Sequence, residues 1–121
     1  MNKAYEQLLT SLLKIYHLQY ALLATSAGTI LATAGSATTL PTSDLVRSLC
    51  GDQAVIQRLD QSLEGQLLPR SWGQGETIAH ICKPSVHQLA ILFGTKTSLQ
   101  HDYELSQHLD QALQQLFTTH S

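Results

Sequence analysis

The spacing of apolar residues predicts an amphipathic helix near each end of the chain. From residue 3 to residue 17 the apolar side chains recur at helical spacing: Tyr5, Leu8, Leu9, Leu12, Leu13 and Tyr16. Near the other end, Thr97 or Ser98 can cap a helix whose apolar face comprises Leu105, Leu109, Ala112, Leu113, Leu116 and Phe117. Because an α-helix turns once in about 3.6 residues, each set lies on one face and is expected to pack against a core.

A third helix is predicted in the middle of the chain, over residues 42–64. Thr42 or Ser43 can cap its first amides, and Asp44 lies near the positive end of its dipole. Gly51 disfavours helix and indicates a bend or a close helix–helix contact, whereas Gly65 is a suitable stop. The predicted apolar face comprises Leu45, Leu49, Ile56, Leu59 and Leu63.

Short apolar runs between the helices predict five strands. Residues 20–25 and 29–34 flank Gly28 and favour a β-hairpin, although their Ala and Leu residues are also compatible with helix. Residues 67–72 form a strand that Pro69 restricts to a sheet edge, followed by a turn at residues 73–75. Residues 77–82 form the next strand, closed by residues 83–85. The continuous apolar run of residues 87–93 is typical of a central strand buried on both faces.

These elements predict one α+β domain over residues 1–121, with the order αββαβββα. A five-stranded, mainly antiparallel sheet of this size needs cover on both faces, and three helices can supply it as an α/β sandwich. The length fits a single domain, and no stretch resembles a linker.

Composition and charge narrow the classes of function. Only 13% of the residues are charged, about half the usual share, which favours burial of surface against another protein. The net charge of −2 and the scattered Lys and Arg residues exclude a typical nucleic-acid-binding surface. Residues 20–35 are too interrupted by polar positions for a membrane span, and residues 1–7 do not resemble a signal peptide, so we expect neither. With Cys50 and Cys82 expected to stay reduced, we expect a cytoplasmic protein.

The sequence shows no set of residues typical of catalysis or of a cofactor site. His101 and His108 lie seven positions apart on the last predicted helix, and His80 is a third candidate ligand, but the usual zinc spacing is missing. Neither cysteine lies in a nucleophile motif. The turn at residues 73–75 lacks the Lys-Ser/Thr that follows a phosphate-binding loop. We therefore expect neither an enzyme nor a metal or cofactor.

In element order and in three local segments, the chain resembles the roadblock/dynein-light-chain superfamily. Residues 20–35 resemble the opening hairpin of that family, and residues 73–78 resemble its Gln-Gly-Glu-x-Ile hairpin in bacterial members. Residues 89–99 resemble its last strand and the Thr-Ser-Leu start of its last helix, although Gln100 stands where many bacterial members have Gly. The resemblance covers roughly residues 5–117 and implies the profilin-like or longin-like sheet of the roadblock fold.

The resemblance implies a homodimer in which the middle helices and the following edge strands pair. The implied interface comprises Leu45, Leu49, Ile56, Leu59, Leu67, Leu68, Arg70 and Trp72. Trp72 is equally compatible with a core position or an interface hot spot. Arg47 and Arg58 are eleven positions apart on one predicted helix, which places them near the same face, and they are candidates for contact with a partner.

In many bacterial members of the family the dimer binds a Ras-like small GTPase, and eukaryotic members act as scaffolds in dynein or lysosomal complexes. The leading hypothesis is a non-enzymatic homodimer that regulates or scaffolds such a GTPase or a motor or signalling complex. A small-molecule-sensing domain is the main alternative, and it predicts an apolar cavity lined by polar groups. A structural subunit of a larger assembly without a GTPase is a third.

Overall fold

The computed structural model describes the backbone of residues 3–40, 44–66 and 68–120. Within these ranges the chain forms a five-stranded sheet, four α-helices and a 3-10 helix. They follow the order α1 (Lys3–Tyr16), β1 (Tyr20–Thr25), β2 (Ile30–Gly35), η1 (Ala37–Thr39), α2 (Asp44–Cys50), α3 (Gln53–Ser62), β3 (Arg70–Gln74), β4 (Thr77–Ser85), β5 (Gln88–Thr95) and α4 (Leu99–His120). The predicted α+β class and its five strands are confirmed.

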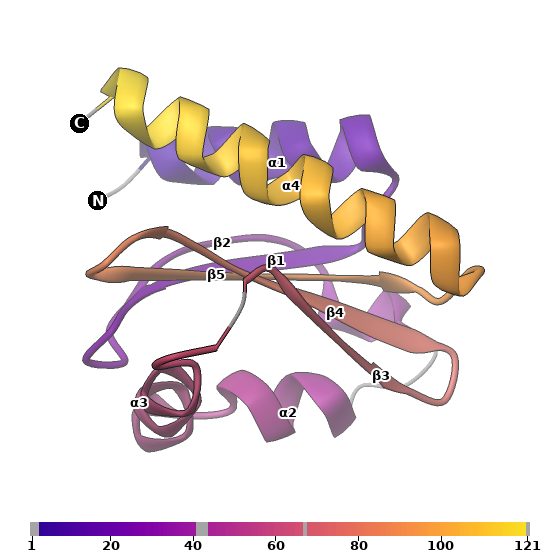
Figure 1. Ribbon diagram of the computed structural model, residues 1–121, viewed down its shortest axis with the longest axis horizontal. Coiled ribbons are helices and arrows are strands. Elements are labelled where there is room, and N and C mark those ends of the chain that lie inside the picture. Colours follow the sequence, from indigo (N-terminus) through magenta and orange to yellow (C-terminus); the bar gives the residue numbers. More distant parts are fainter. Residues whose placement is uncertain (1–2, 41–43, 67, 121) are drawn as a thin grey trace.

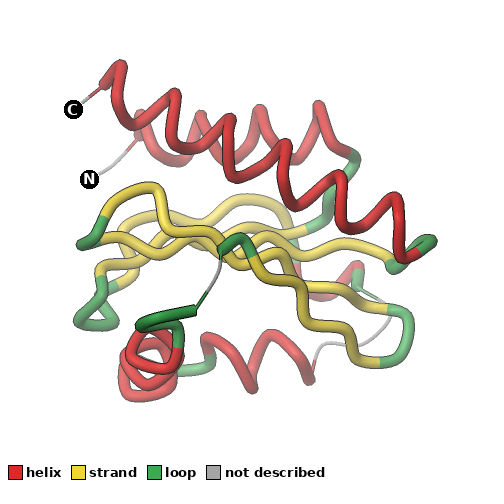
Figure 2. The backbone as a smooth tube through the Cα atoms, viewed as in Figure 1, coloured by secondary structure: helices red, strands yellow, loops and turns green. Residues whose placement is uncertain are grey.

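The sheet lies between two layers of helices, with α1 and α4 on one face and α2 and α3 on the other (Figures 1 and 2). Each face has its own apolar core. Leu9, Leu12 and Leu13 of α1 pack with Leu109 and Leu113 of α4 against the sheet residues that point their way. The side chains of Leu116 and Phe117, predicted for the same face of α4, lie outside the described side chains. On the other face, α2 and α3 cover a second cluster that includes Leu22, Ile81, Leu89, Ile91 and Phe93.

Every strand pair in the sheet is antiparallel, and the strand order is β2-β1-β5-β4-β3. The strand β5 is central, as its continuous apolar run predicts, and residues 89–94 are all buried. The hairpin strand β2 forms one edge of the sheet, and the strand β3 after the middle helices forms the other. The two edges therefore come from different parts of the chain.

The predicted helix over residues 42–64 is wrong in its continuity, because the chain forms α2 and α3 with a break between them. Asp52 is extended at the break, and its carboxylate accepts a hydrogen bond from the Val55 amide at 2.9 Å. A side-chain oxygen that caps free amides starts a new helix, and Gly51 before it weakens the old one. The predicted caps Thr42 and Ser43 lie outside the described residues.

The bounds of two strands, β3 and β4, also differ from the prediction. The strand β3 begins at Arg70 rather than at residue 67, so Pro69 precedes the strand and removes no donor from its pairing with β4. Gly73 and Gln74 belong to β3, and the turn is moved to Gly75, which has a φ of +60°. The strand β4 continues through residues 83–85, which were expected to be a turn. Its register shifts between Cys82 and Ser85, and such an irregularity is where a strand tolerates a proline.

The described helices include none that combines the length and the apolar character needed to cross a bilayer.

Candidate functional site

A surface groove of about 470 Å³ lies between α2, α3 and the edge strand β3. Its floor is apolar, and hydroxyl, amide and guanidinium groups lie around it. The lining residues are Leu45, Ser48, Leu49, Val55, Arg58, Leu59, Ser62, Trp72 and Gln74. Among the described residues, the strand β3 beside the groove has one neighbouring strand, β4.

Trp72 is the large side chain of this groove. It is the middle residue of β3, pairs with Ala79 of β4, and is 49% exposed. A tryptophan that is half exposed beside an apolar groove leaves a large part of its ring for contact with another protein. Of the two interpretations of Trp72 that the sequence allowed, burial in the core is excluded by this exposure.

The apolar strip of the middle helices lies inside the subunit, which corrects the expectation that a second copy must hide it. Leu45, Leu49, Ile56 and Leu59 are at most 8% exposed and belong to the core cluster beneath the sheet. Only the edges of Leu45, Leu49 and Leu59 reach the groove. These four residues therefore stabilise the subunit itself, and their burial gives no argument for dimerisation.

The other residues of the implied interface lie near the start of β3. Leu68 is half-buried and packs against the same core cluster. Arg70 opens the strand, pairs with Ile81 and donates a hydrogen bond from a guanidinium nitrogen to the Gln66 side chain at 3.2 Å. Leu67 lies outside the described residues.

Arg47 and Arg58 occupy different helices, so the expectation that they share one helical face is wrong. The break at Gly51 separates them. Arg47 is exposed and forms an ion pair with Asp44, with 2.9 Å between nitrogen and oxygen. Arg58 lines the groove and takes part in neither of the two ion pairs found among the described residues. Of the two arginines, Arg58 is therefore placed to meet an acidic group beside Trp72.

A buried polar chain, which had no signal in the sequence, links the edge strand β3 to α4 and β4. His80 is fully buried, and its Nδ1 lies 2.5 Å from the Ser106 hydroxyl. Ser106 in turn lies 2.9 Å from the Ser71 hydroxyl on β3. Burial lowers the pKa of His80 to about 4; nearby Asp102 opposes this shift and His101 adds to it. His80 is therefore neutral at pH 7 and acts as a structural link.

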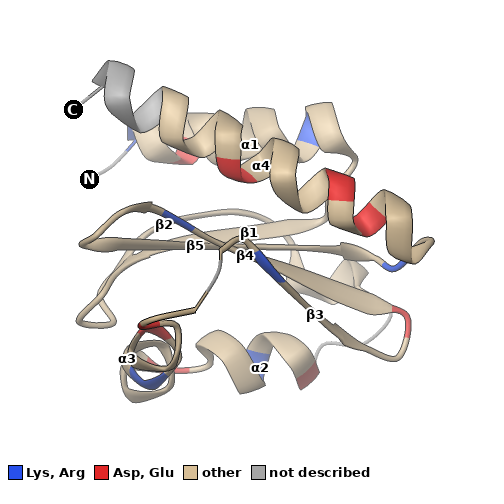
Figure 3. Cartoon of the chain, viewed as in Figure 1, with Lys and Arg blue, Asp and Glu red and all other residues tan. Residues whose placement is uncertain are grey.

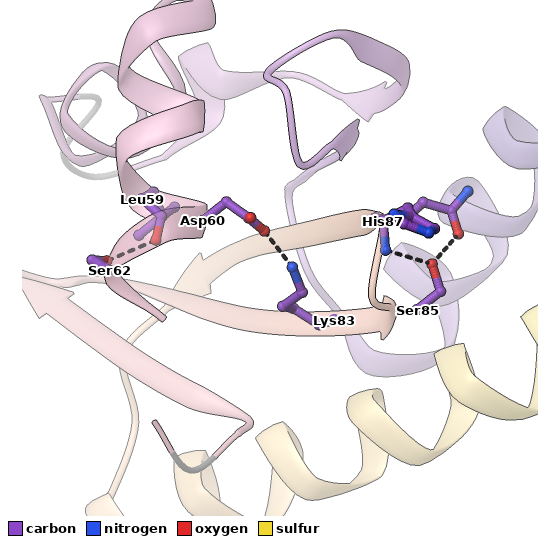
Figure 4. A network of polar contacts seen from close by, with 7 residues as sticks. Leu59, Asp60, Ser62, Lys83, Ser85 and His87 are labelled. Carbon is purple, nitrogen blue, oxygen red and sulfur yellow. Dashed lines mark hydrogen bonds and ion pairs between the residues drawn. The ribbon is translucent and has the colours of Figure 1, made fainter. Parts of the chain in front are cut away.

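An ion pair anchors α3 to the sheet on the groove side. The Lys83 ammonium on β4 contacts the Asp60 carboxylate on α3, and the two side chains are only 18% and 15% exposed. Figure 4 shows the two groups pointing toward one another between the helix and the strand. Because neither charge is fully hydrated, each depends on the other for compensation. The ion pair thus stabilises the position of α3 beside β4.

The candidate metal ligands are not all brought together. His101 and His108 line a second hollow of about 360 Å³, between the end of α1 and the first turns of α4, together with His17. His80 is buried elsewhere, against Ser106. No group of three or more His, Cys, Asp or Glu residues in the described part of the chain has the arrangement of a metal site.

The two cysteines are buried free thiols. Burial raises the pKa of Cys50 to about 12, and burial together with nearby Asp110 also raises the pKa of Cys82. The reactive form of a cysteine is the thiolate, so these environments disfavour a nucleophilic role for either residue.

No protein-family model matches the chain, and no curated protein matches it. Solved structures do. Myxococcus xanthus MglB is 14% identical with a TM-score of 0.61, over 96% of both chains. The gliding protein MglB of Thermus thermophilus is 19% identical with a TM-score of 0.51, over 90% of this chain and 87% of that one.

A Roadblock/LC7 domain from Streptomyces avermitilis is 14% identical with a TM-score of 0.61, over 94% of this chain and 95% of that one. Because the alignments cover nearly the whole chain, they show that the arrangement of helices and strands is shared. Because the identities are low, they do not show that this protein has the partner or the activity of those proteins. The likeness agrees with the element order and sheet described above, and the chain therefore has the roadblock/LC7 fold, which confirms the resemblance seen in its sequence.

Proposed function

We propose that this protein is a non-enzymatic, cytoplasmic homodimer that regulates or scaffolds a Ras-like small GTPase. The sequence resemblance implies this class of function, and the roadblock/LC7 fold is consistent with it. The observation that carries the proposal is the half-exposed Trp72 on an edge strand beside an apolar groove. A surface of this kind is suited to contact with protein.

In the proposed dimer, the β3 strands of two copies pair about a two-fold axis. The unpaired side of β3 supplies backbone donors and acceptors for this contact. Trp72 is the middle of the five residues of β3, so a two-fold axis near the strand centre brings the two Trp72 side chains close together. Leu68 and Arg70, at the start of the strand, then lie toward the periphery of the contact.

The GTPase would dock on the surface that the paired α2 and α3 helices form. Arg58 supplies a cation at the groove, and Arg47, paired with Asp44, supplies a second on α2. The positions of these arginines suit contact with acidic groups on a partner. Any effect on nucleotide turnover would then come from orienting the GTPase's own groups.

The test is a Trp72→Glu variant with Trp72→Phe as its matched control. Glutamate places two like charges near the proposed axis, whereas phenylalanine keeps an aromatic ring there. Light scattering after size exclusion measures the mass, and pull-down and nucleotide-turnover assays use small GTPases encoded near the gene.

We expect Trp72→Glu to lose both the β3 contact and the binding of the GTPase, and Trp72→Phe to keep both. An unchanged mass for Trp72→Glu rules out the β3 dimer, and no binding to any GTPase by the unmodified protein rules out the partner.

A second candidate function, sensing of a small molecule, is favoured by the hollow between α1 and α4. Its volume of about 360 Å³ falls within the usual range of ligand pockets, roughly 300–1,000 Å³. Leu18 and Leu105 line it together with His17, His101 and His108. A thermal-shift screen with a metabolite panel distinguishes the two functions, because ligand binding raises the melting temperature, and a Leu105→Glu variant should abolish that rise.

A further inference from the structure

The hollow between α1 and α4, two helices that cover the same face of the sheet (Figure 1), has an acidic lining. Its volume is about 360 Å³, and its lining includes the carboxylates of Asp102 and Glu104 and no Lys or Arg. Lys14, on the last turn of α1, is not among the lining residues. In its sequence α4 has three acidic residues and no Lys or Arg, and of the two charge colours in Figure 3 it carries the acidic one alone. The hollow therefore presents negative charge to a ligand.

The carboxylate of Asp102 is buried in the wall of this hollow without a cation. The residue is only 4% exposed. Its two oxygens accept hydrogen bonds from Thr97, one from the amide at 3.1 Å and one from the hydroxyl at 2.7 Å. These bonds and the dipole of α4 offset part of the cost of burying the charge. A buried carboxylate is nevertheless usually paired with a cation, and the two ion pairs found in the described part of the chain do not include Asp102.

The basic side chains near Asp102 do not supply that cation. His80 lies close enough for Asp102 to act on its charge, but burial lowers the pKa of His80 to about 4, so that its imidazole is neutral at pH 7. Lys96 lines a separate hollow together with Asp102. Its Nζ lies 3.0 Å from the Cβ position of Gly73 on β3, and it takes part in neither of those two ion pairs. The hollow between α1 and α4 is thus a place where a cation from outside the chain meets an unpaired buried charge.

The backbone holds an imidazole at this hollow in a strained conformation. His17 follows α1 with a φ of +59°, alone among the non-glycine residues of the described chain in having a positive φ. The Leu18 amide donates to the Leu13 carbonyl at 2.9 Å, which is the helix ending that usually takes glycine at this position. Strain of this kind gathers at ligand sites. Together with His101 and His108, His17 gives the hollow side chains that both donate and accept hydrogen bonds.

We propose that the hollow binds a small organic cation, an amine that carries an aromatic or aliphatic group. The ammonium group contacts the exposed carboxylate of Glu104 within the field of the buried Asp102, and the apolar group packs on Leu18 and Leu105. This inference rests on the second candidate function, the sensing of a small molecule, and specifies the charge of the ligand. It is independent of the proposed dimer and of the GTPase.

The experiment titrates the protein with three probes of similar shape and different charge: phenethylamine, phenethyl alcohol and hydrocinnamate. At pH 8 the first is a cation, the second is neutral and the third is an anion, and this pH lies above the range in which histidine usually changes its charge. Calorimetry measures the affinity, and changes in amide chemical shift locate the bound probe. Because a hydrogen bond between charged groups is worth more than a neutral one, we expect the amine to bind about ten-fold more tightly than the alcohol. The anion should bind least, and the shifts should change at residues 15–18 and 101–108.

Two variants test whether the carboxylates of the hollow hold the amine. Glu104→Gln removes the exposed charge and keeps a side chain that accepts the hydrogen bond from Gln100, and Asp102→Asn removes the buried charge. Glu6→Gln is the matched control, because it removes an exposed carboxylate from α1 outside the hollow. We expect each hollow variant to weaken the binding of the amine by about three- to ten-fold and to leave that of the alcohol unchanged. Glu6→Gln should change neither affinity.

Equal affinities for the amine and the alcohol overturn the inference and leave the sensing function standing, because a neutral ligand then fits as well. Amine binding that is unchanged in Glu104→Gln, or no binding of the amine at all, also overturns the inference. The sensing function itself fails only if the metabolite panel gives no rise in melting temperature. Circular dichroism verifies that each variant is folded, and if Asp102→Asn does not fold, Glu104→Gln and its control decide the question.

Discussion

The two edge strands of the sheet differ in how they are protected. The edge β3 starts with Arg70, and the Lys96 side chain lies across its Gly73, with Nζ 3.0 Å from where a Cβ would be. The edge β2 has neither charge nor proline. Charges near an edge oppose uncontrolled pairing, so β3, where a Lys or Arg position lies at the start of the strand (Figure 3), admits only a partner that accommodates them, whereas the stretch that contains β2 has no charge. An apolar groove and an open edge are therefore separate features, and of the two described edges β3 is the one that combines them.

The largest stability effect is expected from Gly28, at the hairpin that leads into β2. Gly28 has a φ of +97°, and a Cβ there would clash with the backbone oxygen of Gln53, at the start of α3. Gly28→Ala combines backbone strain with this clash and should cost about 3–4 kcal/mol of unfolding free energy. The measurement is urea denaturation.

The control is Gly65→Ala. Gly65 also has a positive φ, but nothing lies within 4 Å of its Cβ position, so only strain of about 1–2 kcal/mol is expected. Equal losses in the two variants would show that the contact between the hairpin and α3 contributes nothing. Faster hydrogen exchange in β2 than in β3 would locate the Gly28→Ala effect at the β2 edge.

The next largest loss of stability is expected at acid pH, through the protonation of His80 beside β3. The pKa of His80 in the folded protein is about 4, below its ordinary value of 6.5. Between these values the unfolded chain binds the proton and the folded chain does not, so stability is lost as the pH falls from about 6.5 to about 4. The contribution of His80 to this loss should be about 3 kcal/mol at full protonation, from about 1.4 kcal/mol per pKa unit.

The measurement is urea denaturation of the unmodified protein and of His80→Gln across this range. Because carboxylates also titrate below pH 5, the difference between the two curves isolates the histidine. A parallel pair of curves would contradict the prediction. Since His80 is linked through Ser106 to Ser71 on β3, acid should speed hydrogen exchange in β3 more than in β2.

The smallest loss of unfolding free energy is expected when the ion pair between α3 and β4 is broken. Lys83→Met leaves the Asp60 carboxylate partly buried without its cation. A fully buried pair loses about 3–5 kcal/mol when one partner is removed; with the remaining hydration here, we expect about 2 kcal/mol. Lys14→Met, at an exposed position on α1, is the control and should change stability by less than about 0.5 kcal/mol. Equal values would mean that the pair does not stabilise α3.

Much of the fold could be predicted from the sequence because each element has a local cause. Apolar periodicity predicted α1 and α4, and the unbroken apolar run predicted that β5 is central. The boundaries that failed depend on competition between local signals. Asp52 caps a new helix where periodicity alone predicted continuity, and β4 continues through Pro84 because its register shifts there.

The candidate site was predicted less well. Trp72 was recognised from its type and its place on an expected edge strand, and the structure exposes it. Arg47 and Arg58 were assigned to one face only because the helix break was not foreseen. The chain from His80 to Ser71 had no sequence signal, since Ser106, which joins them, lies 26 positions beyond His80 and the three residues share no motif.

The amino-acid sequence was enough to predict which side chains avoid water and which strand is central, because both follow from the period and composition of short segments. It also determined that the stretch containing β2 has no charge. The three-dimensional arrangement was needed to show that Leu45, Leu49, Ile56 and Leu59 are covered within the subunit and that the uncharged strand lies at an edge. Periodicity shows that a face needs cover, but what covers it depends on contacts between segments that are distant in the chain.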